Sequence, residues 1–236
     1  VSQTLNLASF LNMPARKLTA DQKQLISLGR GLVREDVAAV LMDEPLTVID
    51  PDLKFRLRRS LKEINEQYKT TLVYVTHDQN EAMTFADNII VMDQGEIVQV
   101  GLPKDLFEKP RTTFVGYFIG SPAMNLFNSE ILSDNSLKFN NDTIKTRTDL
   151  SKIKNKDVKL GIRSEFIKIA TDQKENVVNV KVTRVEDLGN YKLITAKMGD
   201  FTIKSKVTRE TEIPSQDVKL HIPAEKCCVY ENNKLI

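Results

Sequence analysis

The sequence is short of cysteine, of net charge and of long apolar runs, and each shortage excludes a class of protein. Its only cysteines are the neighbours Cys227 and Cys228, and two adjacent thiols cannot join distant parts of a fold. We therefore expect a protein of a reducing cytosol. Lys and Arg (34) nearly balance Asp and Glu (32), and the net charge of +2 gives no long-range field that would collect nucleic acid or anionic lipid.

The sequence also lacks the segments that enter or cross membranes. It has no run of about eighteen apolar residues, and its N-terminus has neither the basic nor the apolar region of a signal peptide. Any contact with a membrane is therefore expected to go through partner subunits. The first residues include no initiator Met and lead straight into an apolar pattern, as in a chain entered midway.

Helix and strand patterns alternate from Thr19 to about Val100, which is typical of βαβ units and a parallel sheet. The apolar runs at residues 37–42 and 71–76 predict two strands of the kind that is buried on both faces. Helices are predicted after Thr19, from Pro51 onward and at residues 78–86, and a hairpin is predicted at Gly95.

The pattern changes after two short helical segments, at residues 104–108 and 112–119. Beyond Gly120, short stretches such as Val178, Val180 and Val182 alternate apolar with polar residues and are separated by glycine turns. With 236 residues the chain is long enough for two domains. We therefore predict an α/β domain at residues 1–120 and an all-β domain at residues 121–236.

The clearest chemical signal is a pair of carboxylates, Asp43 and Glu44, directly after the first apolar run. Ligand sites of parallel sheets lie at the carboxyl ends of the strands. A Mg²⁺ ion prefers oxygen ligands, which suits Asp43, and Glu44 would then be free to orient or deprotonate an attacking water. The structural alternative is a pair of acids that ends a strand before the turn at Pro45.

Two further polar residues follow this pair. Asp50 comes after a short turn, and His77 ends the next predicted strand. Because parallel strands open at the same edge of a sheet, His77 is expected near the carboxylates. There it could hydrogen-bond a phosphate oxygen and hold the water and the carboxylate in line. The alternative for a lone histidine is a helix-capping residue.

Upstream, Thr19 and Gln22 precede an amphipathic helix with the spacing of a capping box. An ordinary helix start explains these two residues. The functional alternative is a helix N-terminus that offers its amides to an anion.

In this order, the motifs resemble the ATPase subunits of ABC importers. Residues 18–22 are similar to the ABC signature, 40–45 to Walker B, 46–50 to the D-loop and 74–79 to the switch-histidine segment. Residues 113–115, 118–125 and 160–163 are similar to the maltose and glycerol-phosphate importer branch. The resemblance implies a fold of the α/β class: a partial P-loop NTPase domain of the ABC type, followed by an OB-like β domain for regulation or dimerisation.

The resemblance also implies a mechanism, in which two ATPase subunits close head to tail around ATP and Mg²⁺ and drive membrane-spanning permease subunits. The partners would be those permeases and a second copy or a second ATPase subunit, in the cytoplasm at the inner face of the cell membrane. Six residues would form the site: Asp43 in the Mg²⁺ shell, Glu44 as catalytic base, His77 as γ-phosphate sensor, Asp50 as the contact across the dimer, and Thr19 and Gln22 facing the partner's nucleotide.

The sequence departs from the family in two places. It has no Gly-x-x-x-x-Gly-Lys-Ser/Thr phosphate loop, so we expect no productive ATP binding, and no ATPase activity, by this chain alone. In place of Ser-Gly-Gly, the signature reads Thr19-Ala20-Asp21: Ala20 adds a Cβ where the backbone should approach phosphate, and Asp21 adds a negative charge.

Two hypotheses for the function therefore remain. One is the ATP-hydrolysing subunit of an importer for sugars or glycerol phosphate, and the other is a non-catalytic remnant that dimerises or regulates. An unrelated metal-dependent hydrolase would require all the surrounding motifs to be accidental. Because part of the sheet is not in this sequence, we also expect exposed apolar surface that promotes self-dimerisation or binding to a partner.

Overall fold

The computed structural model describes residues 1–2, 5, 7–34, 36–155, 157–214 and 217–236. These residues form two compact units, Val1–Asp87 (unit 1) and Asn88–Ile236 (unit 2). The division of function at residue 120 stays a prediction; structurally, residues 88–120 group with the β-strands that follow them. None of the described helices is both long and apolar enough to span a membrane.

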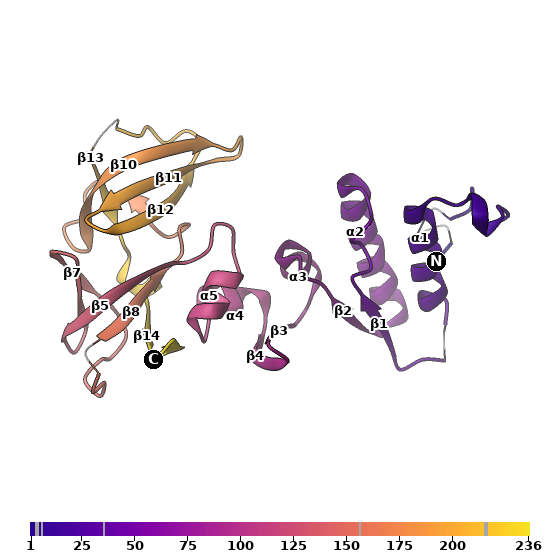
Figure 1. The fold of residues 1–236 in the computed structure, drawn as a ribbon, viewed down its shortest axis with the longest axis horizontal. Helices are drawn as coiled ribbons and strands as arrows, with labels where there is room; N and C mark the ends of the chain where they lie inside the picture. Colours follow the sequence, from indigo (N-terminus) through magenta and orange to yellow (C-terminus); the bar gives the residue numbers. More distant parts are fainter. Residues whose placement is uncertain (3–4, 6, 35, 156, 215–216) are drawn as a thin grey trace. The chain divides into compact units, whose positions relative to one another are not determined.

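Unit 1 combines helices with a short sheet (Figure 1). Its elements are the 3-10 helix Ala15–Lys17, α1 (Ala20–Leu32), β1 (Ala39–Asp43), α2 (Pro51–Tyr68), β2 (Thr71–Val75) and α3 (Gln79–Phe85). The three helices lie where the sequence predicts them. β1 and β2 pair in parallel, with Asp43 opposite Val75, so the expected parallel arrangement is confirmed.

The core of unit 1 forms from the apolar stripes of α1 and α2, which run side by side in Figure 1. Leucines at helical spacing in α1 pack in one buried cluster with Met42 of β1 and with Leu57, Leu61 and Ile64 of α2. Burial of one such side chain stabilises the fold by about 1.5–3 kcal/mol. The cluster therefore fixes one face of the β1–β2 sheet against the helices.

The other face of this sheet is open, which corrects the prediction that both strands are buried on both faces. Leu41 is 78% exposed, Val73 44% and Val75 52%. Leu41 and Val73 are paired and share a face with Val75, so among the described residues this face has no covering layer. Unit 1 thus exposes apolar surface, as expected from the sequence.

Unit 2 begins with the predicted hairpin and two short helices. β3 (Ile89–Asp93) and β4 (Glu96–Gly101) are antiparallel, and Gln94 and Gly95 between them both have positive φ, as a tight type I′ turn requires. α4 (Pro103–Glu108) and α5 (Thr113–Phe118) follow. The hairpin and both helices are confirmed.

The rest of unit 2, as far as the structure describes it, is β-structure with one short 3-10 helix. Its elements are β5 (Asn125–Ser133), β6 (Ser136–Phe139), β7 (Asp142–Lys145), β8 (Asp157–Ile162), β9 (Lys168–Ile169), β10 (Val177–Asp187), β11 (Tyr191–Met198), β12 (Phe201–Thr208), β13 (Asp217–His221), the 3-10 helix Ala224–Lys226, β14 (Cys228–Glu231) and β15 (Lys234–Leu235).

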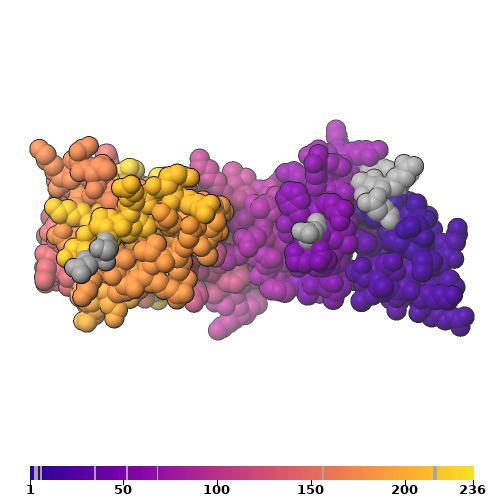
Figure 2. Space-filling view, turned by 90° about the horizontal axis from the view of Figure 1, so that it is seen from above, coloured from indigo at the N-terminus to yellow at the C-terminus, as the bar shows by residue number. Residues whose placement is uncertain are grey.

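These strands form two sheets in the described part of the chain. One has the order β12-β11-β10-β13-β9 and the other β15-β14-β8-β5-β6-β7. Their inner faces share one buried apolar cluster. In the space-filling view, the orange and yellow atoms of residues 177–214 and 217–236 lie side by side over one face (Figure 2). The all-β character predicted after residue 120 is confirmed.

Buried polar side chains connect the elements of unit 2. Arg163, directly after β8, is 0% exposed and donates to the carbonyl oxygens of Phe107 at 2.9 Å and Gly116 at 2.7 Å, and to that of Ile119. These carbonyls lie at the ends of α4 and α5, where the helix leaves them without internal partners. Arg163 therefore ties both helices to the β-structure.

Candidate functional site

The predicted site residues gather mainly at one edge of the β1–β2 sheet. Because the strands are parallel and in register, Asp43 and Glu44 leave β1 at the same edge where Thr76 and His77 leave β2. The backbone N–H of Glu44 donates to the carbonyl of Val75 at 2.9 Å, which extends the pairing by one residue. The expectation that both strand ends meet is confirmed.

Glu44 and His77 are in direct contact. The Oε1 atom of Glu44 lies 2.6 Å from Nδ1 of His77 and also accepts the backbone N–H of His77 at 3.1 Å. Thr47 donates its hydroxyl to the other carboxylate oxygen at 2.8 Å. Glu44 has a positive φ of 47°, an unfavourable backbone conformation for this residue type.

Each residue of the Glu44–His77 pair favours the charged form of the other. The hydrogen bond from His77, assisted by that from Thr47, holds the pKa of Glu44 below its usual range. The hydrogen bond to Glu44, together with its charge, raises the pKa of His77. His77 is 75% exposed and Glu44 36%, so solvent screens the attraction. The arrangement presents an imidazole and a carboxylate in contact at an open surface.

Asp43 is the last residue of β1 and has an exposed side chain. The described residues contain no group of three or more His, Cys, Asp or Glu side chains that could hold a metal ion. Mg²⁺ usually keeps several waters and binds one or two protein carboxylates together with substrate phosphates. Asp43 offers one carboxylate while Glu44 is bonded to His77, so the donor set fits a Mg²⁺ shared with phosphates.

Asp50 precedes the first turn of α2. Its backbone carbonyl accepts the N–H of Lys54 at 2.8 Å, and its carboxylate accepts the N–H of Leu53 at 3.4 Å. These are contacts of a helix N-cap. Asp50 therefore caps the N-terminus of α2, at the end of the turn that begins at Glu44.

Thr19 and Gln22 form the predicted capping box at the start of α1. The Thr19 hydroxyl accepts the N–H of Gln22, and the Gln22 side chain accepts the N–H of Thr19 at 3.0 Å. Thr19 also donates to the carboxylate of Asp21, which holds the pKa of Asp21 below its usual range. The first turn is thus occupied by its own side chains, as in an ordinary helix start.

Gln24 of α1 connects this helix to the carboxylate edge, because its side-chain amide donates to the carbonyl of Pro45 at 3.0 Å. No pattern in the sequence predicts this contact, nor the hydrogen bond from the Thr47 hydroxyl to Glu44. Glu81 was also missed, although it lies 3% exposed in the first turn of α3. A glutamate near a helix N-terminus has an ordinary electrostatic explanation and gives no signal of burial.

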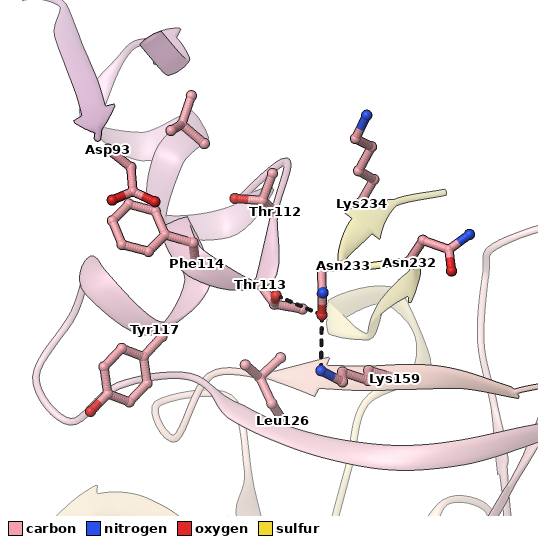
Figure 3. Close-up of a pocket in the computed structure, with 11 residues that line it drawn as sticks. Asp93, Thr112, Thr113, Phe114, Tyr117, Leu126, Lys159, Asn232, Asn233 and Lys234 are labelled. Atoms are coloured by element: carbon pink, nitrogen blue, oxygen red, sulfur yellow. Dashed lines mark hydrogen bonds between the residues drawn. The ribbon is translucent and has the colours of Figure 1, made fainter. Parts of the chain in front are cut away.

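Unit 2 has a cavity of about 500 Å³ beside α5, β8 and the turn before β15 (Figure 3). Asn233 lies at its edge and accepts hydrogen bonds from Thr113 at 3.1 Å and from the ammonium of Lys159 at 2.8 Å. The rings of Phe114 and Tyr117 line another part of the wall. These hydrogen bonds join α5 and β8 to the C-terminal turn.

Comparison with known proteins extends this picture. The family model described as the MalK OB fold domain matches residues 120–167. The trehalose/maltose import ATP-binding protein MalK of Thermococcus litoralis is 36% identical over 224 residues, which cover 90% of this chain and 60% of that protein. The oligosaccharides import ATP-binding protein MsmX of Bacillus subtilis is 34% identical, covering 92% and 61%.

A third relative is the sn-glycerol-3-phosphate import ATP-binding protein UgpC of Pectobacterium atrosepticum, 34% identical over 98% of this chain and 65% of its own length. The chain therefore spans between 60% and 65% of the length of these relatives.

The resemblance to the ATP-binding subunits of ABC importers is confirmed. Within that class, the relatives and the matched OB fold domain belong to the carbohydrate and glycerol-phosphate branch. The predicted fold class, a partial ABC ATPase domain followed by an OB-like β domain, is confirmed as well.

Proposed function

We propose that the chain forms the hydrolytic edge, the signature helix and the regulatory β domain of the ATP-binding subunit of an ABC importer for sugars or glycerol phosphate. The observation that carries this proposal is the contact between Glu44 and His77 at the carboxyl edge of parallel strands. The relatives named above support the class of transporter.

In this function, Glu44 accepts a hydrogen bond from the attacking water and orients it, and His77 keeps the carboxylate in place. With Nδ1 engaged by Glu44, the exposed imidazole has Nε2 available to donate to the γ-phosphate. A Mg²⁺ ion, when bound, supplies charge neutralisation for the phosphates, and Asp43 would hold it. The contacts with His77 and Thr47 hold the Glu44 carboxylate in one orientation, in which it can orient the water or accept its proton.

The remaining roles concern a second subunit. Asp50 would contact the partner across the dimer, and Thr19 and Gln22 would face the partner's nucleotide. The partners would be permease subunits and a second ATP-binding subunit, with the protein in the cytoplasm at the inner face of the cell membrane. Productive ATP binding would need a phosphate loop, a motif that these 236 residues do not contain.

A chimera tests this proposal. The part of the Bacillus subtilis relative that this chain does not match is joined to residues 1–236, and Mg-ATP binding is measured by calorimetry on the chimera and on the chain alone. We expect binding only by the chimera. Its ATP hydrolysis should fall by about 10²- to 10⁴-fold in Glu44→Gln with ATP still bound.

The matched control is Glu63→Gln, which changes an exposed carboxylate of α2 that pairs with Arg59. Hydrolysis should continue in that variant at the parent rate. A Glu44→Gln chimera as active as its parent would refute the catalytic assignment, and micromolar Mg-ATP binding by the chain alone would reveal a nucleotide site outside these motifs.

The first turn of α1 favours the second candidate function, a non-catalytic dimerising or regulatory module. Thr19, Asp21 and Gln22 hydrogen-bond one another there, and the charge of Asp21 would repel a phosphate. If the chimera binds ATP but hydrolyses it only after Ala20→Gly and Asp21→Gly, the native chain acts as a module. Hydrolysis by the unmodified chimera would exclude that function.

A further inference from the structure

Glu81 is a buried carboxylate of α3 with partners in α2, in β2 and directly after β2. Its Oε2 atom accepts the phenol hydroxyl of Tyr74 at 2.8 Å and the hydroxyl of Thr76 at 3.0 Å. Its Oε1 atom lies 3.6 Å from the ammonium of Lys54 and 3.9 Å from the guanidinium of Arg58. Glu81 therefore links α3 to the end of β2 and to α2.

The contacts explain why this charge can be buried. An ionised carboxylate leaves water at a high free-energy cost unless cations and hydrogen-bond donors replace the solvent. Glu81 has two of each, and Lys54 and Arg58 are one helical turn apart, so both reach the same carboxylate. Burial and the contact with Glu81 raise the pKa of Tyr74, so its hydroxyl stays a donor. The carboxylate is consequently held in one position.

Thr76 transmits that position to His77. Its hydroxyl donates to Glu81 and accepts the backbone N–H of Asp78 at 3.0 Å, so both residues that flank His77 are fixed. The backbone N–H and the imidazole of His77 can then meet the same carboxylate oxygen of Glu44. A turn left free would make this double contact entropically costly.

Lys54 connects the same carboxylate to the turn that carries Asp50. The ammonium of Lys54 pairs with Glu81, while its backbone N–H donates to the carbonyl of Asp50 at 2.8 Å. A continuous series of contacts therefore runs from Asp50 through Lys54, Glu81 and Thr76 to His77.

We propose that Glu81 is a positioning residue that couples the Asp50 turn to the Glu44–His77 pair. It touches neither the nucleotide nor the water itself. The inference builds on the proposed function, in which Asp50 meets the second subunit: a shift of that turn would reach His77 through Lys54 and Glu81.

The test follows the titration of the His77 imidazole by NMR in the 236-residue chain. The carboxylates of Glu44, Asp78 and Glu81 all act on this imidazole, so Glu81→Gln also changes its electrostatic surroundings. Thr76→Val leaves every charge in place and removes only the hydroxyl. We expect Thr76→Val and Glu81→Gln both to lower the pKa of His77 toward its usual value, and Thr76→Ser, which keeps the hydroxyl, to preserve it.

If the pKa of His77 falls in Glu81→Gln but not in Thr76→Val, Glu81 acts through its charge alone, and the positioning role is overturned. Should Glu81→Gln fail to fold, the comparison of Thr76→Val with Thr76→Ser still decides the question. Equal His77 titrations in those two variants would also refute the proposal.

The link to Asp50 is tested with Lys54→Met, which keeps the aliphatic stem and removes the ammonium. The matched control is Arg59→Met on the same helix, whose guanidinium pairs with exposed Glu63 and does not reach Glu81. We expect Lys54→Met to shift the His77 resonances and the backbone amide of Asp78, and Arg59→Met to leave both unchanged. Equal chemical shifts of His77 and Asp78 in the two variants would refute the proposed coupling.

In the chimera, Thr76→Val should lower the rate of hydrolysis by about a hundredfold, the effect of a small misplacement of a catalytic group, with the KM for ATP unchanged. The NMR measurements need no ATP, so they separate the two proposals. An inactive chimera with the expected His77 shifts would refute the proposed function alone, and an active chimera without those shifts would refute the positioning role alone.

Discussion

Arg163 in unit 2 and His77 in unit 1 are both placed by hydrogen bonds, yet with opposite kinds of partner. Arg163 is fully buried and donates to backbone carbonyls, whereas His77 is largely exposed and bonds to the carboxylate of Glu44. Backbone carbonyls do not titrate or move independently, so hydrogen bonds to them stabilise the fold. A carboxylate at an open sheet edge can exchange its hydrogen bonds with a ligand, so it is suited to binding or catalysis.

The comparison predicts its largest effect at Arg163. Arg163→Met removes this donor from the carbonyls of Phe107 and Ile119 at the ends of α4 and α5, and each buried group left unsatisfied is penalised by about 1–3 kcal/mol. We expect unit 2 to lose more than about 3 kcal/mol of unfolding free energy, measured by urea denaturation followed through NMR peaks of unit 2.

The control for this change is Arg184→Met, which removes an arginine that is 70% exposed and paired with Glu186. It should shift the urea midpoint little. If Arg163→Met were as mild as the control, the bonds from Arg163 to the helix ends would not be what holds α4 and α5 on the sheet.

A smaller effect is expected at Asn125, which joins the two sheets of unit 2. Its amide donates to the carbonyls of Ile162 at 3.2 Å and Lys204 at 2.9 Å and accepts the N–H of Lys204 at 2.8 Å. Asn125→Ala should lower the unfolding free energy by about 2 kcal/mol, while Asn128→Ala, an exposed position on the same strand, should change it little. Equal urea midpoints would contradict the link between the sheets.

A smaller loss again is expected at the capping box of unit 1. Thr19→Ala removes the acceptor for the N–H of Gln22 and should destabilise α1 by about 1 kcal/mol, as thermal or urea unfolding of unit 1 would show. Thr19→Ser keeps the hydroxyl and should retain most of that stability. A loss of equal size in both variants would mean that the methyl group of Thr19, and not its cap, stabilises the helix.

The sequence allowed the helices, the hairpin and the position of His77 at the same sheet edge as Asp43 and Glu44 to be predicted, but not the direct contact between Glu44 and His77. Periodicity places α1 and α2, Gly95 supplies the turn, and parallel strands bring their ends together. Two further features escaped prediction because they depend on distant partners. The apolar residues of β1 do not reveal that Leu41 lacks a covering layer, and Glu81 does not reveal the cations that α2 supplies to it.

The smallest expected effect on stability lies at the exposed pair of Glu44 and His77, and this effect depends on pH. Glu44→Gln removes the partner that raises the pKa of His77, so the imidazole should titrate at lower pH in NMR. His77 is one of two histidines, and His221→Asn assigns its signal.

Stability should depend on pH for the same reason. The raised pKa of His77 stabilises the fold at pH values below 6.5, the ordinary pKa of histidine, and this contribution is lost as pH rises through the folded-state pKa. The lowered pKa of Glu44 stabilises above 4.5 and is lost on acidification, so the pair contributes most between these values. Glu44→Gln should weaken that pH dependence, since the carboxylates of Asp78 and Glu81 remain, and an unchanged His77 titration would show that the contact does not persist in solution.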